Sequence, residues 1–136
     1  MIMNIIQKNN IKPGDGLVRS KSFLGLIDHY GLYVGQSKVI ENHPLHGVRL
    51  ITLAEFLDGR QLLRIKRYLG NEWSRSNAVS KAHRMIGTRY DVLDFNCEHF
   101  VNHIHNIGVK SNQADVARGL FFGVLAIGFI AAISGD

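Results

Sequence analysis

Alternating apolar and polar positions in the first half of the chain predict a small antiparallel sheet. Residues 29–35, His-Tyr-Gly-Leu-Tyr-Val-Gly, are rich in aromatic and β-branched side chains and end at a glycine turn. Because side chains alternate along a strand, His29, Gly31 and Tyr33 should occupy one face and the intervening residues the other. A two-residue turn follows, so the next apolar run is expected to form a hairpin with this strand. The predicted strands are 17–19, 29–35, 38–43, 48–51 and 62–68.

The helices are predicted from the helical repeat of apolar residues and from capping residues. Thr52-Leu-Ala-Glu55 has the form of a capping box, so a short helix should begin there. Ser74 or Ser76 is the expected N-cap of a second helix, which continues to Met85. Strands followed by helices indicate an α+β fold, with a small antiparallel sheet packed on helices.

A third helix should carry the only cysteine of the chain. Its apolar face consists of Phe100, Val101, Ile104 and Ile107. Asp94 is the expected N-cap and Gly108 the expected end, which places Cys97 in the first turn. Unsatisfied backbone N–H groups and the positive end of the helix dipole favour a thiolate at that position. A lone cysteine is usually an inert buried side chain, so a reactive role requires an imidazole close to it.

The end of the chain differs in character from the rest. Residues 119–134 contain no charged side chain, but a membrane-spanning helix needs roughly 20 apolar residues. The composition favours membrane insertion or lipid contact for this segment. The alternative is a terminal helix packed on the domain or on a partner subunit. We therefore expect an N-terminal extension over 1–12, a catalytic domain over 13–110, and an apolar C-terminal helix over 111–136 as a candidate membrane anchor.

Length and composition fit one globular domain of 136 residues. A single cysteine excludes an intrachain disulfide and fits a cytoplasmic location. The N-terminus lacks the apolar length and the cleavage site of a signal peptide. The net charge of +5 suits contact with an anionic surface. It does not distinguish phospholipid from nucleic acid, and a solvated basic face is the simpler interpretation.

His29 is the leading candidate for the base that a reactive cysteine needs. It begins a strand whose other residues have ordinary structural side chains, and its own tautomer must be set by a third group. On the neighbouring predicted strand, Glu41 and His43 share one face. A carboxylate stabilises an imidazolium better than a second imidazole does, which favours Glu41, with His43 as the alternative.

The remaining histidines and charged residues indicate no further site. His99 and His103 are four residues apart on one predicted helix, but no third ligand accompanies them, so they are expected to be surface residues rather than metal ligands. The glycines form no phosphate-binding loop. We therefore expect neither a metal nor a cofactor. Arg64 and Lys66 share one face of the last predicted strand, where a solvated basic face is expected.

Two segments together resemble the lecithin:retinol acyltransferase-like family. They are His29-Tyr-Gly-Leu-Tyr-Val-Gly35 and Asn96-Cys-Glu-His-Phe-Val101, which are similar to the H-box and NC motifs of that family. The likeness covers roughly residues 13–134. It implies a circularly permuted papain-like (NlpC-type) fold in which the histidine precedes the cysteine. It also implies Cys97 as the nucleophile and His29 as the general base.

The resemblance implies that an acyl chain passes from a phospholipid to Cys97 as a thioester, and then to water, an amine or an alcohol. A phospholipid or other acyl-bearing substrate and a membrane surface are the implied partners, and nucleic acid is not. Many members of the family have a second histidine where Glu41 stands here, which leaves the third role open between Glu41 and His43. Two other interpretations remain: a cysteine peptidase or amidase, and a non-catalytic binding module.

Overall fold

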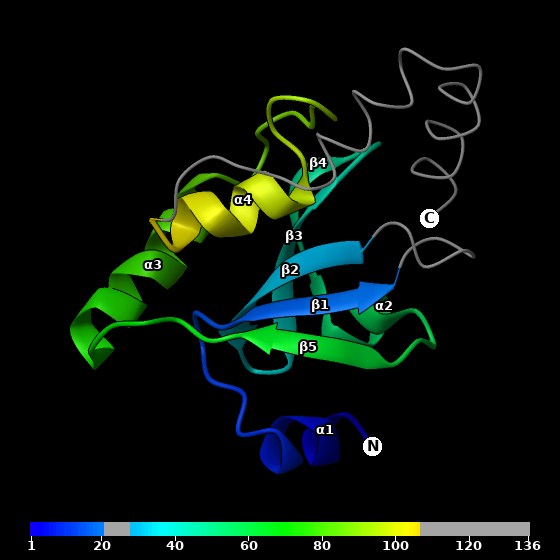
Figure 1. The fold of residues 1–136 in the computed structure, drawn as a ribbon, viewed down its shortest axis with the longest axis vertical. Helices are drawn as coiled ribbons and strands as arrows, with labels where there is room; N and C mark the ends of the chain where they lie inside the picture. The colour runs from blue at the N-terminus through cyan, green and yellow to red at the C-terminus, as the bar shows by residue number, and fades with distance from the viewer. Residues whose placement is uncertain (21–27, 107–136) are drawn as a thin grey trace.

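In the computed structural model, which describes residues 1–20 and 28–106, antiparallel strands form a single five-stranded sheet (Figure 1). The strands are β1 (Gly16–Ser20), β2 (Asp28–Gly35), β3 (Lys38–His43), β4 (Gly47–Thr52) and β5 (Leu62–Lys66). Their order across the sheet is β4-β3-β2-β1-β5. The predicted hairpin of β2 and β3 is confirmed, with Gly31 opposite Glu41. The prediction of an α+β fold with a small antiparallel sheet is confirmed.

Helices cover both faces of this sheet. They are α1 (Ile2–Lys8), α2 (Leu53–Leu57), α3 (Glu72–Arg84) and α4 (Cys97–Ile104). α3 and α4 pack on one face, and α1 and α2 pack on the other (Figure 1). Thr52 caps α2 through the predicted capping box with Glu55. The sequence analysis did not identify α1.

Each face of the sheet has its own apolar cluster, as the alternation in β2 predicted. Tyr30 and Leu32 belong to the cluster that includes Phe100 of α4. Tyr33 belongs to the cluster that includes Phe56 of α2. Both clusters contain completely buried side chains. The sheet therefore lies between two close-packed apolar layers, and its side chains are held in fixed orientations.

Two of the predicted helix starts are wrong. α4 is capped by Asn96 rather than Asp94, and α3 by Asn71 rather than by a serine. The helix cannot begin at Asp94 because reciprocal backbone hydrogen bonds between Asp91 and Phe95, 2.8 and 2.9 Å long, hold this stretch in a tight turn. In α3, Ser74 lies three residues inside the helix and donates its own N–H to the asparagine cap.

The ends of two elements also differ from the prediction. α4 ends at Ile104, and Asn106 has a positive φ of 57°, which a continuing helix does not allow. β5 ends at Lys66 rather than Tyr68, where the backbone N–H of Tyr68 turns to the carboxylate of Asp15. The end of β5 is therefore set by a side chain that is distant in the sequence.

Asp15 joins three parts of the fold through a buried carboxylate. It accepts hydrogen bonds from the backbone of Lys12 and Tyr68 and forms ion pairs at 3.0 Å with Arg67 and Arg75. Burial alone would raise the pKa of Asp15, but these hydrogen bonds outweigh it and lower the pKa. The N-terminal turn, the end of β5 and α3 are therefore held together by one charge.

The predicted apolar C-terminal helix over 111–136 lies outside the described residues. Among the helices of the described residues, none has the length and apolar character needed to cross a membrane.

Candidate active site

His29 is completely buried at the beginning of β2. Its Nε2–H donates to Oε1 of Glu41 over 2.7 Å, and its ring stacks on Phe56 with 5.4 Å between ring centroids. Gly31 keeps this arrangement compact, because a Cβ there would lie 2.7 Å from the Phe56 ring. The imidazole therefore has a fixed orientation and a fixed partner at one nitrogen.

Glu41 extends from the middle of β3 and is buried, with 2% of its side chain exposed. One carboxylate oxygen accepts from His29, and the other accepts from Nε of Arg49 over 2.9 Å. Burial would raise the pKa of Glu41, but its interactions with His29 and then Arg49 outweigh burial and lower the pKa to about 2. Glu41 is therefore a carboxylate at neutral pH.

His43, the alternative third residue, is directed elsewhere. Its Nδ1 accepts the backbone N–H of Leu45 over 3.1 Å, and its ring lies 4.8 Å from that of His46. Of the two candidates named from the sequence, the structure brings Glu41 to His29.

Cys97 is the first residue of α4, and its side chain is buried. The sulfur lies 4.0 Å from the backbone oxygen of Asp28, the residue before His29. Figure 1 shows the first turn of α4 beside the beginning of β2. Residues 97 and 29, which are far apart in the sequence, therefore meet where this helix and this strand begin.

The thiol and the imidazole also interact electrostatically. Burial opposes protonation of His29, but its contacts with Cys97 and with Glu41 outweigh burial and raise its pKa. Glu41 occupies Nε2, and Nδ1 is buried without a hydrogen-bond partner in the described part of the chain. Nδ1 is thus the nitrogen left for the thiol. A thiolate beside an imidazolium is the form in which a cysteine attacks.

His99 was predicted to lie on the surface, and this prediction is wrong. It is buried, and its Nδ1 accepts the backbone N–H of Asn96 over 3.2 Å. The side chain of Asn96 accepts the backbone N–H of His99 in return, over 3.0 Å. This reciprocal cap fixes the turn that carries Cys97. The Asn-x-x-His spacing was the available signal, although capping boxes usually have Glu or Gln at the third position. His103 is exposed, as predicted.

Arg64 and Lys66 were expected on a solvated face, but they make contacts next to the site. Arg64 donates to the hydroxyl of Tyr30 over 2.8 Å and pairs with Asp28 over 2.9 Å. Lys66 donates to Asn102 of α4 over 2.8 Å. Arg64 has 51% of its side chain exposed, as the predicted solvated face requires, whereas Lys66 is partly buried by these contacts with Tyr30 and α4.

Tyr90 lies on the approach to the cysteine and is half-buried. Burial raises its pKa, and the neighbouring negative charges of Cys97 and Asp91 raise it further. Its phenol is therefore neutral at physiological pH.

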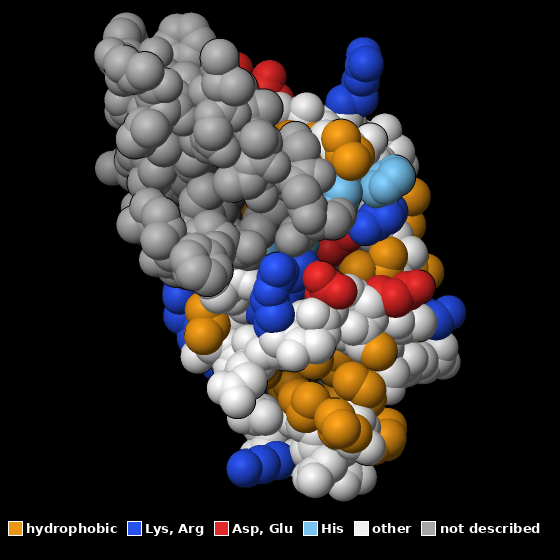
Figure 2. All heavy atoms as spheres, turned by 90° about the vertical axis from the view of Figure 1, so that its right-hand side faces the viewer, with side chains coloured by type: hydrophobic (Ala, Val, Ile, Leu, Met, Phe, Trp, Pro, Cys, Tyr) orange, Lys and Arg blue, Asp and Glu red, His pale blue; other side chains and the backbone are white. Residues whose placement is uncertain are grey.

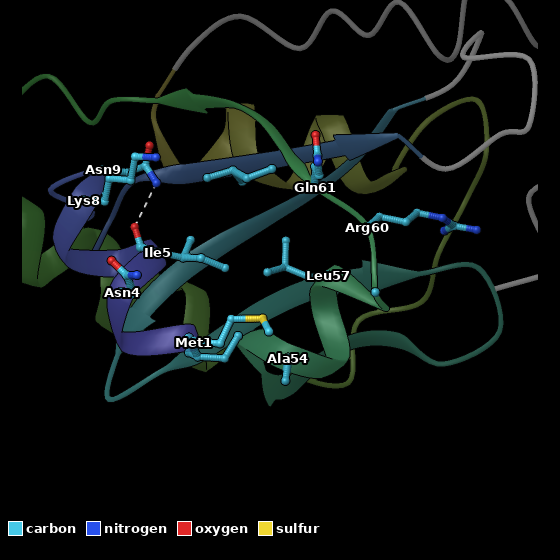
Figure 3. A pocket seen from close by; sticks show the side chains of 12 residues that line it. Met1, Asn4, Ile5, Lys8, Asn9, Ala54, Leu57, Arg60 and Gln61 are labelled. Carbon is cyan, nitrogen blue, oxygen red and sulfur yellow. Dashed lines mark hydrogen bonds between the residues drawn. The ribbon is translucent and has the colours of Figure 1, made fainter.

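One hollow in the described part of the chain is lined by a residue of the site. A small polar cavity of about 140 Å³ is lined by Arg19, Glu41, His43, Arg49, Glu55 and Asp58. On the face seen in Figure 2, acidic, basic and histidine side chains lie close together above an apolar hollow. A larger groove of about 740 Å³ lies between α1 and α2, where Ile5 and Leu57 point toward each other (Figure 3). This groove is not lined by Cys97, His29 or Glu41.

Within residues 1–20 and 28–106, no group of three or more His, Cys, Asp or Glu side chains is arranged to hold a metal ion. The polar groups gathered at Cys97 are those of a thiol, an imidazole and a carboxylate, a set suited to nucleophilic chemistry.

Comparison with known families gives one match. The family model for lecithin retinol acyltransferase matches residues 9–109. The chain belongs to the lecithin retinol acyltransferase family. The match spans the whole sheet together with α2, α3 and α4, and so includes His29, Glu41 and Cys97. No match was found among the curated proteins. Membership of the lecithin retinol acyltransferase family is consistent, at the level of the family, with a thiol-dependent enzyme of the acyltransferase type.

Proposed function

We propose that this protein is a cysteine-dependent acyltransferase or lipid hydrolase that takes an acyl chain from a phospholipid onto Cys97. The observation that carries the proposal is the contact of three groups from separate elements. Glu41 of β3 accepts a hydrogen bond from His29 of β2 over 2.7 Å. The sulfur of Cys97, at the start of α4, lies 4.0 Å from the backbone oxygen of Asp28, the residue before His29. Family membership supports the same chemistry.

In the first half of the reaction, the thiolate of Cys97 attacks the ester carbonyl and forms a carbon–sulfur bond. The imidazolium of His29 then gives its proton to the departing alkoxide as the carbon–oxygen bond breaks, leaving a thioester and a neutral imidazole. Backbone N–H groups in the first turn of α4 are the proposed donors to the oxyanion, a contribution of about 3 kcal/mol.

In the second half, neutral His29 takes a proton from water, an amine or an alcohol. The acceptor attacks the thioester, the acyl chain leaves on it, and the thiolate of Cys97 is restored beside an imidazolium. Glu41 has a supporting role in both halves, because a carboxylate at Nε2 keeps the ring oriented and stabilises its protonated form.

The proposal includes the circularly permuted papain-like arrangement and contact with a membrane. The order of His29 before Cys97, with the cysteine at a helix start, supports the first. The uncharged run over 119–134 and the net charge of +5 support the second. We propose that this run brings the site to the bilayer in which the substrate is concentrated.

Turnover of phosphatidylcholine tests the proposal. Vesicles carrying a labelled acyl chain are incubated with the full chain, and free or transferred acyl groups are measured. We expect the variants Cys97→Ala and His29→Gln each to lose roughly 10³-fold or more in rate, while their far-UV circular dichroism stays like that of the wild type. His83→Gln, an exposed histidine of α3, is the matched control and should keep its rate.

Two outcomes would contradict the lipid proposal. One is cleavage of peptide or amide substrates by a wild-type protein that leaves phosphatidylcholine intact, because the same three groups would then serve an amidase. The other is lipid turnover that survives in Cys97→Ala.

A further inference from the structure

We propose that Arg49 is a positioning residue of this site, which orients Glu41 and offsets its charge and thereby sets the pH range in which Cys97 and His29 react. This inference rests on the proposed function, because it assumes that the thiol and the imidazole act as a pair. Arg49 itself touches neither of them and acts through Glu41.

The sheet places Arg49 for this role. It stands on β4 directly opposite Glu41 of β3 in the strand register. Cross-strand partners share a face of the sheet, so the guanidinium reaches the same carboxylate that binds His29 of β2. The three side chains therefore form a chain of hydrogen bonds across three neighbouring strands, with distances of 2.7 Å and 2.9 Å.

Burial makes the contact important. Glu41 has 2% of its side chain exposed, whereas Arg49 has 36% exposed. Both carboxylate oxygens are occupied, one by His29 and one by Arg49. A buried carboxylate with a free oxygen would be costly and could turn away from the imidazole. Arg49 donates to Oε2 of Glu41 from the solvent side, and this hydrogen bond keeps Oε1 directed at His29.

The charges around Glu41 explain why a cation is needed there. With Cys97 as a thiolate, the protonated His29 balances one negative charge, and Glu41 adds a second. The polar cavity beside them is also lined by Glu55 of α2, by Asp58, the residue that ends this helix, by Arg19 of β1 and by His43 of β3. Arg19 is engaged with backbone oxygens of Phe56 and Ser20. Arg49 is bonded directly to the carboxylate of Glu41, over 2.9 Å.

Loss of this cation has a definite sign. A more negative surrounding favours the protonated form of His29 and disfavours the thiolate of Cys97. The lower end of the reactive pH range is set by ionisation of Cys97 and the upper end by loss of the proton from His29. Both ends should therefore move to higher pH. Loss of Glu41 removes a negative charge from His29 and should move the upper end downward. The two substitutions thus have opposite effects on the same imidazole.

The experiment measures the rate of alkylation of the full chain by iodoacetamide as a function of pH. The chain has one cysteine, so the label reports this thiol without any assumption about the substrate. We expect Arg49→Gln to move both limbs upward by at least ~0.5 pH unit and Glu41→Gln to move the upper limb downward. Arg49→Lys keeps the charge and should recover half or more of the shift. Arg84→Gln, an exposed arginine of α3, should not move the profile.

Arg49→Thr, a residue suited to an edge strand, replaces the glutamine variant if that variant does not fold. A folded neutral variant with an unshifted profile overturns the inference, as does a shift in the same direction as that of Glu41→Gln. If the profile shifts as expected but phosphatidylcholine is not turned over, the proposed function fails and the role of Arg49 in tuning the thiol stands.

Discussion

Glu41 shows how far the sequence determines a single residue of the site. Strand alternation narrowed the third residue to Glu41 or His43, since both lie on one face of β3. Alternation could not decide which of the two binds His29, because that depends on the path of the chain after β3 and on the register of β3 with β2. Leu45 donates its backbone N–H to His43, while the register with β2 places Glu41 opposite Gly31 and within reach of His29.

Substitution of these two residues should separate their roles. We expect Glu41→Gln to lower lipid turnover by about 10²-fold or more, because a neutral amide stabilises the imidazolium poorly. His43→Gln should change it by less than about 3-fold. Initial rates with labelled phosphatidylcholine provide the measurement. A large loss in His43→Gln with a small one in Glu41→Gln would reverse the assignment.

The same substitution has a consequence for stability at low pH. The folded protein lowers the pKa of Glu41 from 4.5 to about 2. Its contribution is therefore present above the unfolded value and is lost as the pH falls toward 2. The shift corresponds to on the order of 3 kcal/mol. Urea unfolding at pH 7 and pH 3 should show the free-energy difference between wild type and Glu41→Gln shrinking at the lower pH. A constant difference would contradict the charge state assigned to Glu41.

At the scale of the element, the start of α4 determines where the thiol lies. The apolar repeat was sufficient to predict the helix and to place Cys97 in its first turn. The cap was not predictable in the same way, because Asp94 and Asn96 are both good N-cap residues. Asp94 lies within the tight turn that begins at Asp91, so the helix starts after it. Buried His99 and Asn96 then exchange hydrogen bonds that cap the helix.

Two asparagine caps in this chain allow a matched test of that element. Asn71→Ala should lower the free energy of unfolding by about 1 kcal/mol, the usual cost of losing an N-cap. Asn96→Ala should lower it by more, because the buried Asn96 side chain also donates to the backbone oxygen of Val92 over 3.1 Å. Only Asn96→Ala should also lower lipid turnover, on the order of 10-fold or more, because it loosens the turn that carries Cys97. Urea unfolding and initial rates measure the two effects. Equal activity losses in the two variants would indicate a general effect of stability rather than of position.

At the scale of the whole molecule, the pairing of β2 with β3 and the two faces of β2 were predictable, whereas the order of the other strands was not. The alternation in β2 gave both faces correctly. Strand alternation does not predict contacts between segments that are distant in the sequence. Examples are the ion pairs of buried Asp15 with Arg67 and Arg75 and the hydrogen bond from Arg64 to Tyr30. α1 was missed although Ile2, Ile5 and Ile6 have helical spacing, because seven residues give too short a pattern without its packing partner.

The arrangement of the whole molecule leads to one chemical consequence: the fold brings a thiol and an imidazole together so that Cys97 can hold an acyl group. Intact-mass spectrometry tests this most directly. The full chain is mixed with phosphatidylcholine vesicles and quenched in acid within one turnover. The account predicts a mass increase equal to one acyl group on Cys97 that neutral hydroxylamine removes and that Cys97→Ala does not show. Release of fatty acid without any such adduct, or an adduct on another residue, would contradict it.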